Sequence, residues 1–130
     1  MDLDVDETAW PIVIVRWVGI PKDSTLTTFL GCMDRWLAKG ERFGLLMDTR
    51  AGGGLSPEQR VRVIDHMKAH SALTEKFYVQ AMVISSVVQR TLFYGINVIF
   101  KNPFPSKIFA DVESARAWLE SELGHPRAKE

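Results

Sequence analysis

The hydropathy pattern of the chain alternates between short continuous apolar runs and longer stretches in which apolar residues recur every three or four positions. The short runs predict buried strands, and the longer stretches predict amphipathic helices. The predicted strands span residues 11–19, 43–48, 78–85 and 106–110, and a predicted helix follows each, at 24–39, 58–77, 87–101 and 112–123. Parallel strands need crossover connections, and helical crossovers cover the faces of a sheet. The pattern therefore predicts an α/β fold with a mainly parallel sheet of four or five strands, flanked by about four helices.

The apolar positions of the helices also predict which side chains form the core. In the first helix they share one face: Leu26, Phe29, Leu30, Met33, Trp36 and Leu37. We expect Asp23 or Ser24 to cap this helix and Gly40 to end it. In the second helix the residues expected toward the core are Val61, Val63, Ile64 and Met67.

The length of 130 residues, 46% of them hydrophobic, predicts one domain over residues 1–130. Residues 3–6 alternate in polarity, as an antiparallel edge strand would. We expect the core to span about residues 10–123 and residues 124–130 to form a polar tail.

Charge and composition exclude several classes of function. Sixteen basic and sixteen acidic residues cancel, so the basic surface of a nucleic-acid-binding protein is not expected. No apolar run approaches the ~20 residues of a transmembrane helix, and the acidic start MDLDVDE does not resemble a signal peptide. These features, with a single cysteine, Cys32, predict a cytoplasmic protein. We expect Cys32 to fill space beside the first helix's apolar face.

A glycine-rich segment, DTRAGGGLSPEQ at residues 48–59, follows the second predicted strand. Ligands of α/β sheets bind beyond the carboxyl ends of strands, so Asp48, Gly52, Gly53, Gly54 and Ser56 are candidates for a ligand or anion loop. The competing interpretation is a turn. Asp48 is a common turn residue, and Ser56, Pro57 and Gln59 match a capping box at a helix start.

Two histidines, His66 and His70, are spaced to share a helix face, as two ligands of one metal ion must. A third ligand is not identifiable from the sequence, so we predict no metal site. The sequence also contains no recognisable cofactor motif and no paired nucleophile and base, so we predict a non-enzymatic protein.

The predicted helix at 87–101 is apolar on more faces than a helix covering a sheet needs. Leu92 and Ile96 belong to one face, and the residues most available for an interaction are Phe93, Tyr94, Asn97 and Phe100. The surplus can be buried by the loop around Phe104, by a second copy of the chain or another protein, or by an apolar ligand.

The runs PIVIVRWVG, FGLLMDTR and YVQAMVISS, followed by NPFPSKIFADVESARAWLESEL, resemble small bacterial SpoIIAA-like proteins of the STAS and Sec14-like group. The resemblance covers about residues 10–123 and is best carried by Phe109 to Leu119. In that stretch Asp111 is the expected helix cap, and Ala115, Trp118 and Leu119 share one helix face.

This resemblance implies a STAS-like domain, usually a non-enzymatic module that binds proteins, nucleotides or apolar ligands. STAS antagonists of anti-sigma factors carry an Asp-Ser-Ser-Gly type of phosphorylation switch. Here the corresponding segment reads Leu55-Ser56-Pro57-Glu58, with Ser56 as its one serine. We therefore expect an interaction or regulatory module acting through residues 87–101, as a homodimer or with a protein partner, and alternatively a carrier of a small apolar or amphiphilic molecule.

Overall fold

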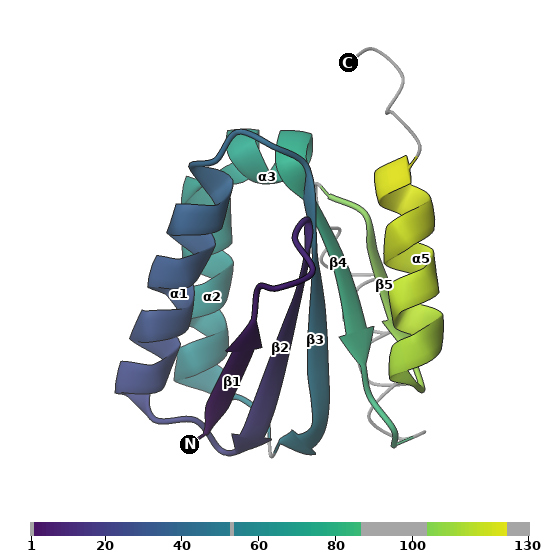
Figure 1. The fold of residues 1–130 in the computed structure, drawn as a ribbon. Coiled ribbons are helices and arrows are strands. Elements are labelled where there is room, and N and C mark those ends of the chain that lie inside the picture. The colour runs from purple at the N-terminus through teal and green to yellow at the C-terminus, as the bar shows by residue number, and fades with distance from the viewer. Residues whose placement is uncertain (1, 53, 87–103, 125–130) are drawn as a thin grey trace.

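The protein forms a five-stranded sheet with helices on both faces (Figure 1). The computed structural model describes residues 2–52, 54–86 and 104–124. Their elements are β1 (Leu3–Asp6), β2 (Ile12–Gly19), α1 (Asp23–Leu37), β3 (Phe43–Gly52), α2 (Pro57–Ala69), α3 (Ser71–Phe77), β4 (Tyr78–Val83), β5 (Ser106–Phe109) and α5 (Val112–Gly124). The predicted helix at 87–101, with Phe93, Tyr94, Asn97 and Phe100, lies outside the described residues.

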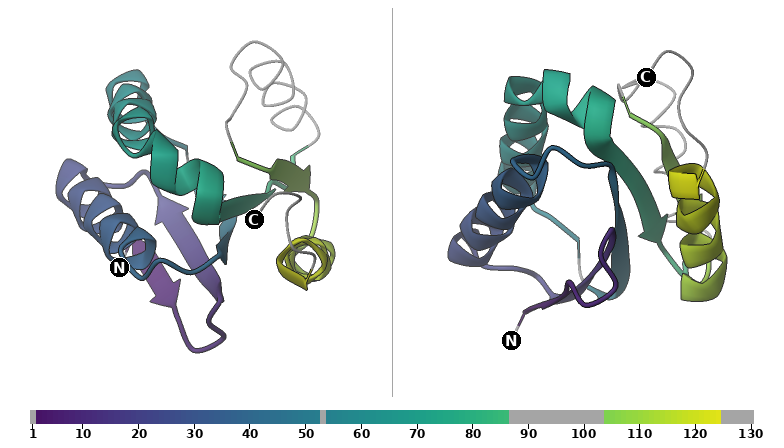
Figure 2. Two further views of the ribbon diagram at one scale, coloured as in Figure 1. Left: turned by 90° about the horizontal axis from the view of Figure 1, so that it is seen from above. Right: turned by 45° about the horizontal axis from the view of Figure 1, so that its top comes forward.

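The strand order is β1-β2-β3-β4-β5. β1 pairs antiparallel with β2, and all other neighbours are parallel. This confirms both the mainly parallel sheet and the antiparallel edge strand predicted at residues 3–6. α1, α2 and α3 lie on one side of the sheet, and α5 lies on the other (Figure 2).

The central strands are buried on both sides, which explains their continuous apolar runs. Toward α1 they contribute Val13, Val15, Phe43 and Leu45, and toward α5 they contribute Ile12, Leu46, Val79 and Ala81. All six predicted core residues of α1 are buried, but α1 ends at Leu37, and Gly40, with a φ of 67°, follows in the turn after it. Cys32 is half-buried against the α1-side core, as expected of a small filler.

The predicted second helix is divided into α2 and α3 at His70. The backbone of His70 leaves the helical conformation, with φ −112° and ψ 24°, and its N–H donates to the carbonyl of Met67. The His70 ring instead bonds the carbonyl of His66, at 2.9 Å. The ring of His70 thus bonds the carbonyl of His66, which a backbone N–H would bond in a continuous helix. The apolar spacing of the sequence does not reveal this exchange.

The predicted burial of α2 is only partly correct. Val63 and Met67 pack against the core, whereas Val61 and Ile64 are 56% and 44% exposed. The buried residue of this helix is instead polar, Gln59. The inward side of α2 therefore carries the hydrogen bonds of Gln59 with Pro21 and Asp23, which the apolar spacing does not predict.

Two glycines differ in the space around them, so substitutions at the two positions should have opposite effects on stability. A Cβ on Gly44 would lie 2.9 Å from Cδ2 of Leu119, whereas one on Gly31, inside α1, would meet nothing within 4 Å. We expect Gly44→Val to lower the free energy of unfolding by about 1–3 kcal/mol through overpacking. Gly31→Ala should raise it by up to ~1 kcal/mol through helix propensity. Urea unfolding of both variants tests this, and equal effects would contradict the packing described for Gly44.

Candidate functional site

The side chain of Asp48 is the centre of a charged cluster on β3, at the level where the neighbouring strand β4 ends. The residue is only 2% exposed. Its Oδ1 accepts from the backbone N–H and the Nε of Arg50, at 3.1 and 2.9 Å, and its Oδ2 accepts from an Nη of Arg50, at 2.8 Å. Such a two-pronged pair fixes both the carboxylate and the guanidinium.

Charges of alternating sign continue across the sheet at the same level. Arg16 of β2 lies opposite Asp48, with its Nε 3.6 Å from Oδ2, and Asp4 of β1 lies opposite Arg16. Directly opposite residues share a face of the sheet, here the face that carries α5. Asp111 precedes α5 and interacts electrostatically with Arg50. We call these five residues the strand-end cluster.

Hydrogen bonds favour the ionised form of two carboxylates of this cluster, those of Asp48 and Asp111. Hydrogen bonds from the Arg50 side chain lower the pKa of Asp48 below its ordinary value, against the opposing effect of burial. The pKa of Asp111 is lowered as well, because Oδ1 accepts the backbone N–H of Ser114 at 2.7 Å. That bond confirms Asp111 as the cap of α5. The groups of this cluster that reach solvent include the partly exposed guanidinium groups of Arg16 and Arg50, which can donate hydrogen bonds.

Ser56 caps α2 with a capping box, as the sequence predicts. Its Oγ accepts the backbone N–H of Gln59 at 3.1 Å, and the Gln59 Oε1 accepts the backbone N–H of Ser56 at 2.9 Å. The Gln59 amide also donates to the carbonyl of Pro21 and to Oδ1 of Asp23. The cap therefore ties the start of α2 to the connection between β2 and α1.

The other predicted residues of the glycine-rich segment are placed differently. Asp48 and Gly52 belong to β3 rather than to a turn or loop, because β3 continues to residue 52. Its extra residues pair with β2 beyond an irregularity between Arg16 and Val18, so that Gly52 lies opposite Gly19. Gly54 adopts φ 86° in the exposed connection to α2. Gly53 lies outside the described residues, and the anion loop stays a prediction.

Sequence reasoning missed the two arginines of the cluster. A signal was available for Arg50, since residues two apart in a strand share a face and Arg50 follows Asp48 by two. The sequence predicts a strand that ends at Asp48, and the rule does not apply beyond the end of a strand. The partnership with Arg16 depends on strand register, which the sequence does not display.

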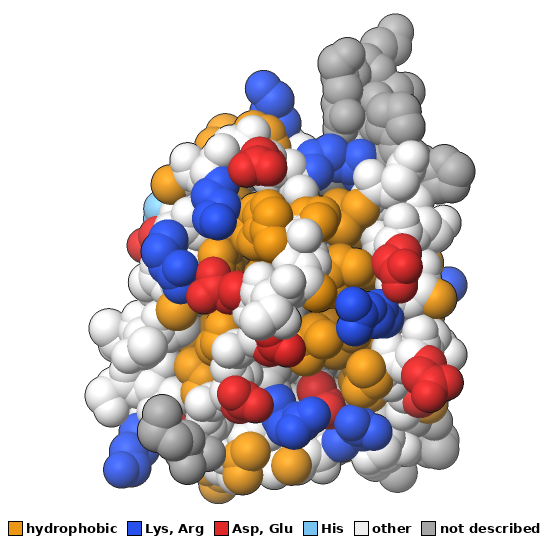
Figure 3. Space-filling view, viewed as in Figure 1, with side chains coloured by type: hydrophobic (Ala, Val, Ile, Leu, Met, Phe, Trp, Pro, Cys, Tyr) orange, Lys and Arg blue, Asp and Glu red, His pale blue; other side chains and the backbone are white. Residues whose placement is uncertain are grey.

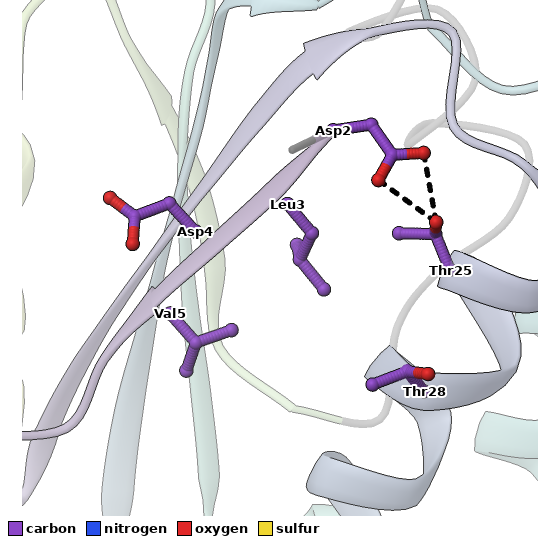
Figure 4. Close-up of a pocket in the computed structure, with 6 residues that line it drawn as sticks. All are labelled: Asp2, Leu3, Asp4, Val5, Thr25 and Thr28. Atoms are coloured by element: carbon purple, nitrogen blue, oxygen red, sulfur yellow. Dashed lines mark hydrogen bonds between the residues drawn. The ribbon is translucent and has the colours of Figure 1, made fainter.

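A shallow groove of about 440 Å³ lies between β1 and α1. Leu3 and Val5 point from β1 toward α1, while Asp4 points the other way (Figure 4). Asp2 closes one end by accepting from the hydroxyl of Thr25, at 2.8 and 2.9 Å.

Comparison with solved structures identifies the fold. An uncharacterised DUF3478-family protein with a SpoIIAA-like fold from Shewanella loihica matches with a TM-score of 0.68 and 18% identity, over 90% of this chain and 91% of its own. The unphosphorylated anti-sigma factor antagonist SpoIIAA matches at 0.64 and 12%, over 91% and 97%. A putative anti-sigma factor antagonist from Thermotoga maritima matches at 0.62 and 13%, over 91% and 94%.

These likenesses show that the chain has the SpoIIAA-like fold. No protein-family model matches the sequence, and no curated protein matches it. Among the described residues, none of the helices is both long enough and apolar enough to cross a membrane.

The Asp48–Arg50 pair predicts an acid-sensitive contribution to stability. We expect Asp48→Asn to lower the free energy of unfolding at neutral pH by about 1–3 kcal/mol, because a buried group loses charged hydrogen bonds. Since the folded-state pKa of Asp48 is depressed, this contribution is present above the unfolded-state pKa and is lost as pH falls through the folded-state pKa. The difference between wild type and Asp48→Asn should therefore shrink below about pH 4.

Urea unfolding at several pH values measures this difference. The control is Arg16→Gln, which removes a longer and more exposed contact with the same carboxylate and should cost less than ~1 kcal/mol. A difference between wild type and Asp48→Asn that stays constant down to the lowest pH would contradict the role assigned to the pair.

Proposed function

We propose that the protein is a non-enzymatic regulatory module that binds a protein partner. The fold is shared with proteins described as anti-sigma factor antagonists, whose description implies protein targets. The observation that carries the proposal is the set of large apolar side chains that α2 and the connection before α1 expose to solvent. Folded proteins expose single apolar residues freely, but a group of them favours an interaction site.

This exposed group consists of Ile20, Val61 and Ile64, which are 71%, 56% and 44% exposed. Ile20 precedes Pro21, whose carbonyl accepts the Gln59 amide, and Val61 follows Gln59 by two residues. Val61 and Ile64 are three apart on α2 and are therefore neighbours on its surface. Ile20 lies in the connection that the Gln59 hydrogen bond ties to α2, and we call the three exposed side chains the α2 apolar surface.

Residues 87–101 are proposed as a second surface, on sequence grounds. Their surplus of apolar positions, including Phe93, Tyr94 and Phe100 with Asn97 among them, supports self-association or docking of a partner. A homodimer is the form proposed first, since a self-complementary patch is the commonest way to bury such a surface.

A carrier of a small apolar or amphiphilic molecule is the second candidate function. The groove between β1 and α1 favours it, because Leu3 and Val5 supply an apolar wall. The face carrying β1 also shows apolar side chains at its centre with charged ones around them (Figure 3). Polar Asp2, Thr25 and Thr28 at the rim suit an amphiphile better than a hydrocarbon.

Regulation by phosphorylation of Ser56 is a further proposal. A phosphate at a helix N-terminus is favoured by the helix dipole, so the modification would not by itself disrupt α2. It would, however, place a dianion where the Ser56 hydroxyl now accepts from Gln59. Since Gln59 also holds the connection before α1, phosphorylation could alter the α2 apolar surface.

The α2 apolar surface predicts that a charge placed on it weakens partner binding without unfolding the domain. We expect Val61→Asp to raise the dissociation constant of a purified partner at least tenfold, as loss of an interface anchor does, and to change the free energy of unfolding by no more than ~0.5 kcal/mol. Ala117→Asp is the matched control, because Ala117 is exposed on α5, across the sheet. Isothermal titration calorimetry measures the constants. Equal affinity of Val61→Asp and Ala117→Asp would contradict the proposed surface.

Native mass spectrometry of the untagged protein tests residues 87–101 and the carrier function together. A ligand-free dimer that becomes a folded monomer on Phe93→Asp is the expected result. If Phe93→Asp instead unfolds the domain, Phe93 is a core residue and the second surface loses its support. An additional mass that organic solvent removes would favour the carrier, and a phosphate increment at Ser56 would support regulation there.

A further inference from the structure

The contact between α1 and α2 is lined by polar side chains. An Nη of Arg62 donates to the hydroxyl of Thr27 at 2.9 Å, and the Gln59 amide donates to Asp23. At the far end of α2, His66 and His70 meet Asp34 of α1. These contacts lie outside the strand-end cluster, and the last of them brings together three potential metal ligands.

The three ligand atoms converge on one point. Nε2 of His66 lies 2.7 Å from Oδ1 of Asp34, and Nε2 of His70 lies 3.5 Å from the same oxygen. All three atoms lie within 4.8 Å of one another. Zinc bonds of ~2.0–2.1 Å to nitrogen and oxygen require ligand atoms about 3.3 Å apart at tetrahedral angles. The two nitrogen–oxygen separations, 2.7 and 3.5 Å, lie on either side of that value. Small rotations of the side chains would therefore bring the ligand atoms to zinc-binding positions.

The hydrogen bond of the second ring nitrogen prepares His70 for a cation. Its Nδ1 lies 2.9 Å from the carbonyl oxygen of His66, which can only accept, so Nδ1 carries a proton. In a neutral ring Nε2 then presents a lone pair, and this lone pair faces a carboxylate oxygen of Asp34. Two electron-rich atoms that face each other favour a positive charge between them. The bond to a backbone carbonyl is also the second-shell contact that orients metal-binding histidines.

We propose that Asp34, His66 and His70 form a binding site for a divalent transition-metal ion, with zinc as the best match. Two imidazoles and one carboxylate are the ligand types that zinc accepts, and a fourth position stays open to water or to a ligand from another molecule. The side chains are 47%, 21% and 34% exposed, in the order given, so an ion can reach them from solvent. Bound zinc replaces the proton that His66 shares with Asp34, and that proton moves to Nδ1 or leaves to solvent.

The proposed site lies between two helices, so a bound ion would connect them. One ligand comes from α1 and two come from the last turn of α2 and the residue that follows it. Zinc would therefore crosslink the two helices at the end opposite the Ser56 cap. Because α2 buries only Gln59, such a crosslink would hold a helix whose own apolar contacts are few.

Titration of chelator-treated, untagged protein with Zn²⁺ tests the proposal. Calorimetry should show one ion per chain. Co²⁺ should give the visible absorption of a tetrahedral site, and Zn²⁺ should raise the melting temperature of the wild type. We expect His66→Gln, His70→Gln and Asp34→Asn each to weaken binding at least tenfold, since even outer-shell changes cost about 10–100-fold.

Two control variants keep the test specific. Asp65→Asn removes a carboxylate from α2, and His125→Ala removes the third histidine of the chain, and both should bind zinc like the wild type. Asp34 is exposed, so Asp34→Asn should remain folded by circular dichroism. The absence of one-to-one zinc binding, or unchanged affinity in Asp34→Asn and His66→Gln, would overturn the proposal.

Discussion

β3 is buried on both of its faces, and the rest of the structure is arranged around that burial. Phe43 and Leu45 face α1, while Leu46 faces α5, and each is fully buried. Helical crossovers between parallel strands cover both faces of a sheet, and β3 is parallel to both of its neighbours. The absence of a side chain at Gly44 lets α5 approach closely, with Leu119 next to the backbone. The same double burial makes a charged side chain in β3 acceptable only when it is paired, as Asp48 is.

The sequence predicts those elements whose position depends on apolar burial. The sheet, the inward face of α1 and the edge strand at residues 3–6 all leave a periodic trace in the chain. The sequence mispredicts the ends of two elements, β3 and α2, where backbone pairing or a polar side chain sets the boundary. β3 runs beyond Asp48 because its backbone keeps pairing with β2, and α2 ends at His70, where a ring nitrogen replaces a backbone donor. Neither event changes the hydropathy pattern.

In the candidate sites too, contacts between residues close in the sequence are predictable, and contacts between distant residues are not. The capping box of Ser56 and Gln59 is local, so it is readable from the sequence and confirmed by the structure. By contrast, Arg16 meets Asp48, and Asp34 meets His66, across 32 residues in both cases. Such pairs depend on strand register and on how two helices lie against each other. A sequence can suggest two metal ligands on one helix, but it cannot name the third until α1 and α2 are placed.

α2 differs from the other long helices in how it is attached. α1 buries six apolar residues and α5 buries two, whereas Gln59 is the buried residue of α2. Hydrogen bonds of Gln59, Arg62 and His66 hold it against α1. Polar attachments contribute less net free energy than apolar burial, and they respond to charge. The phosphate proposed at one end of α2 and the metal ion proposed at the other would therefore both act on a helix that is attached by polar contacts. The proposed partner surface of Val61 and Ile64 lies on this same helix, so the proposed phosphorylation and the proposed metal site would both act on the element that carries it.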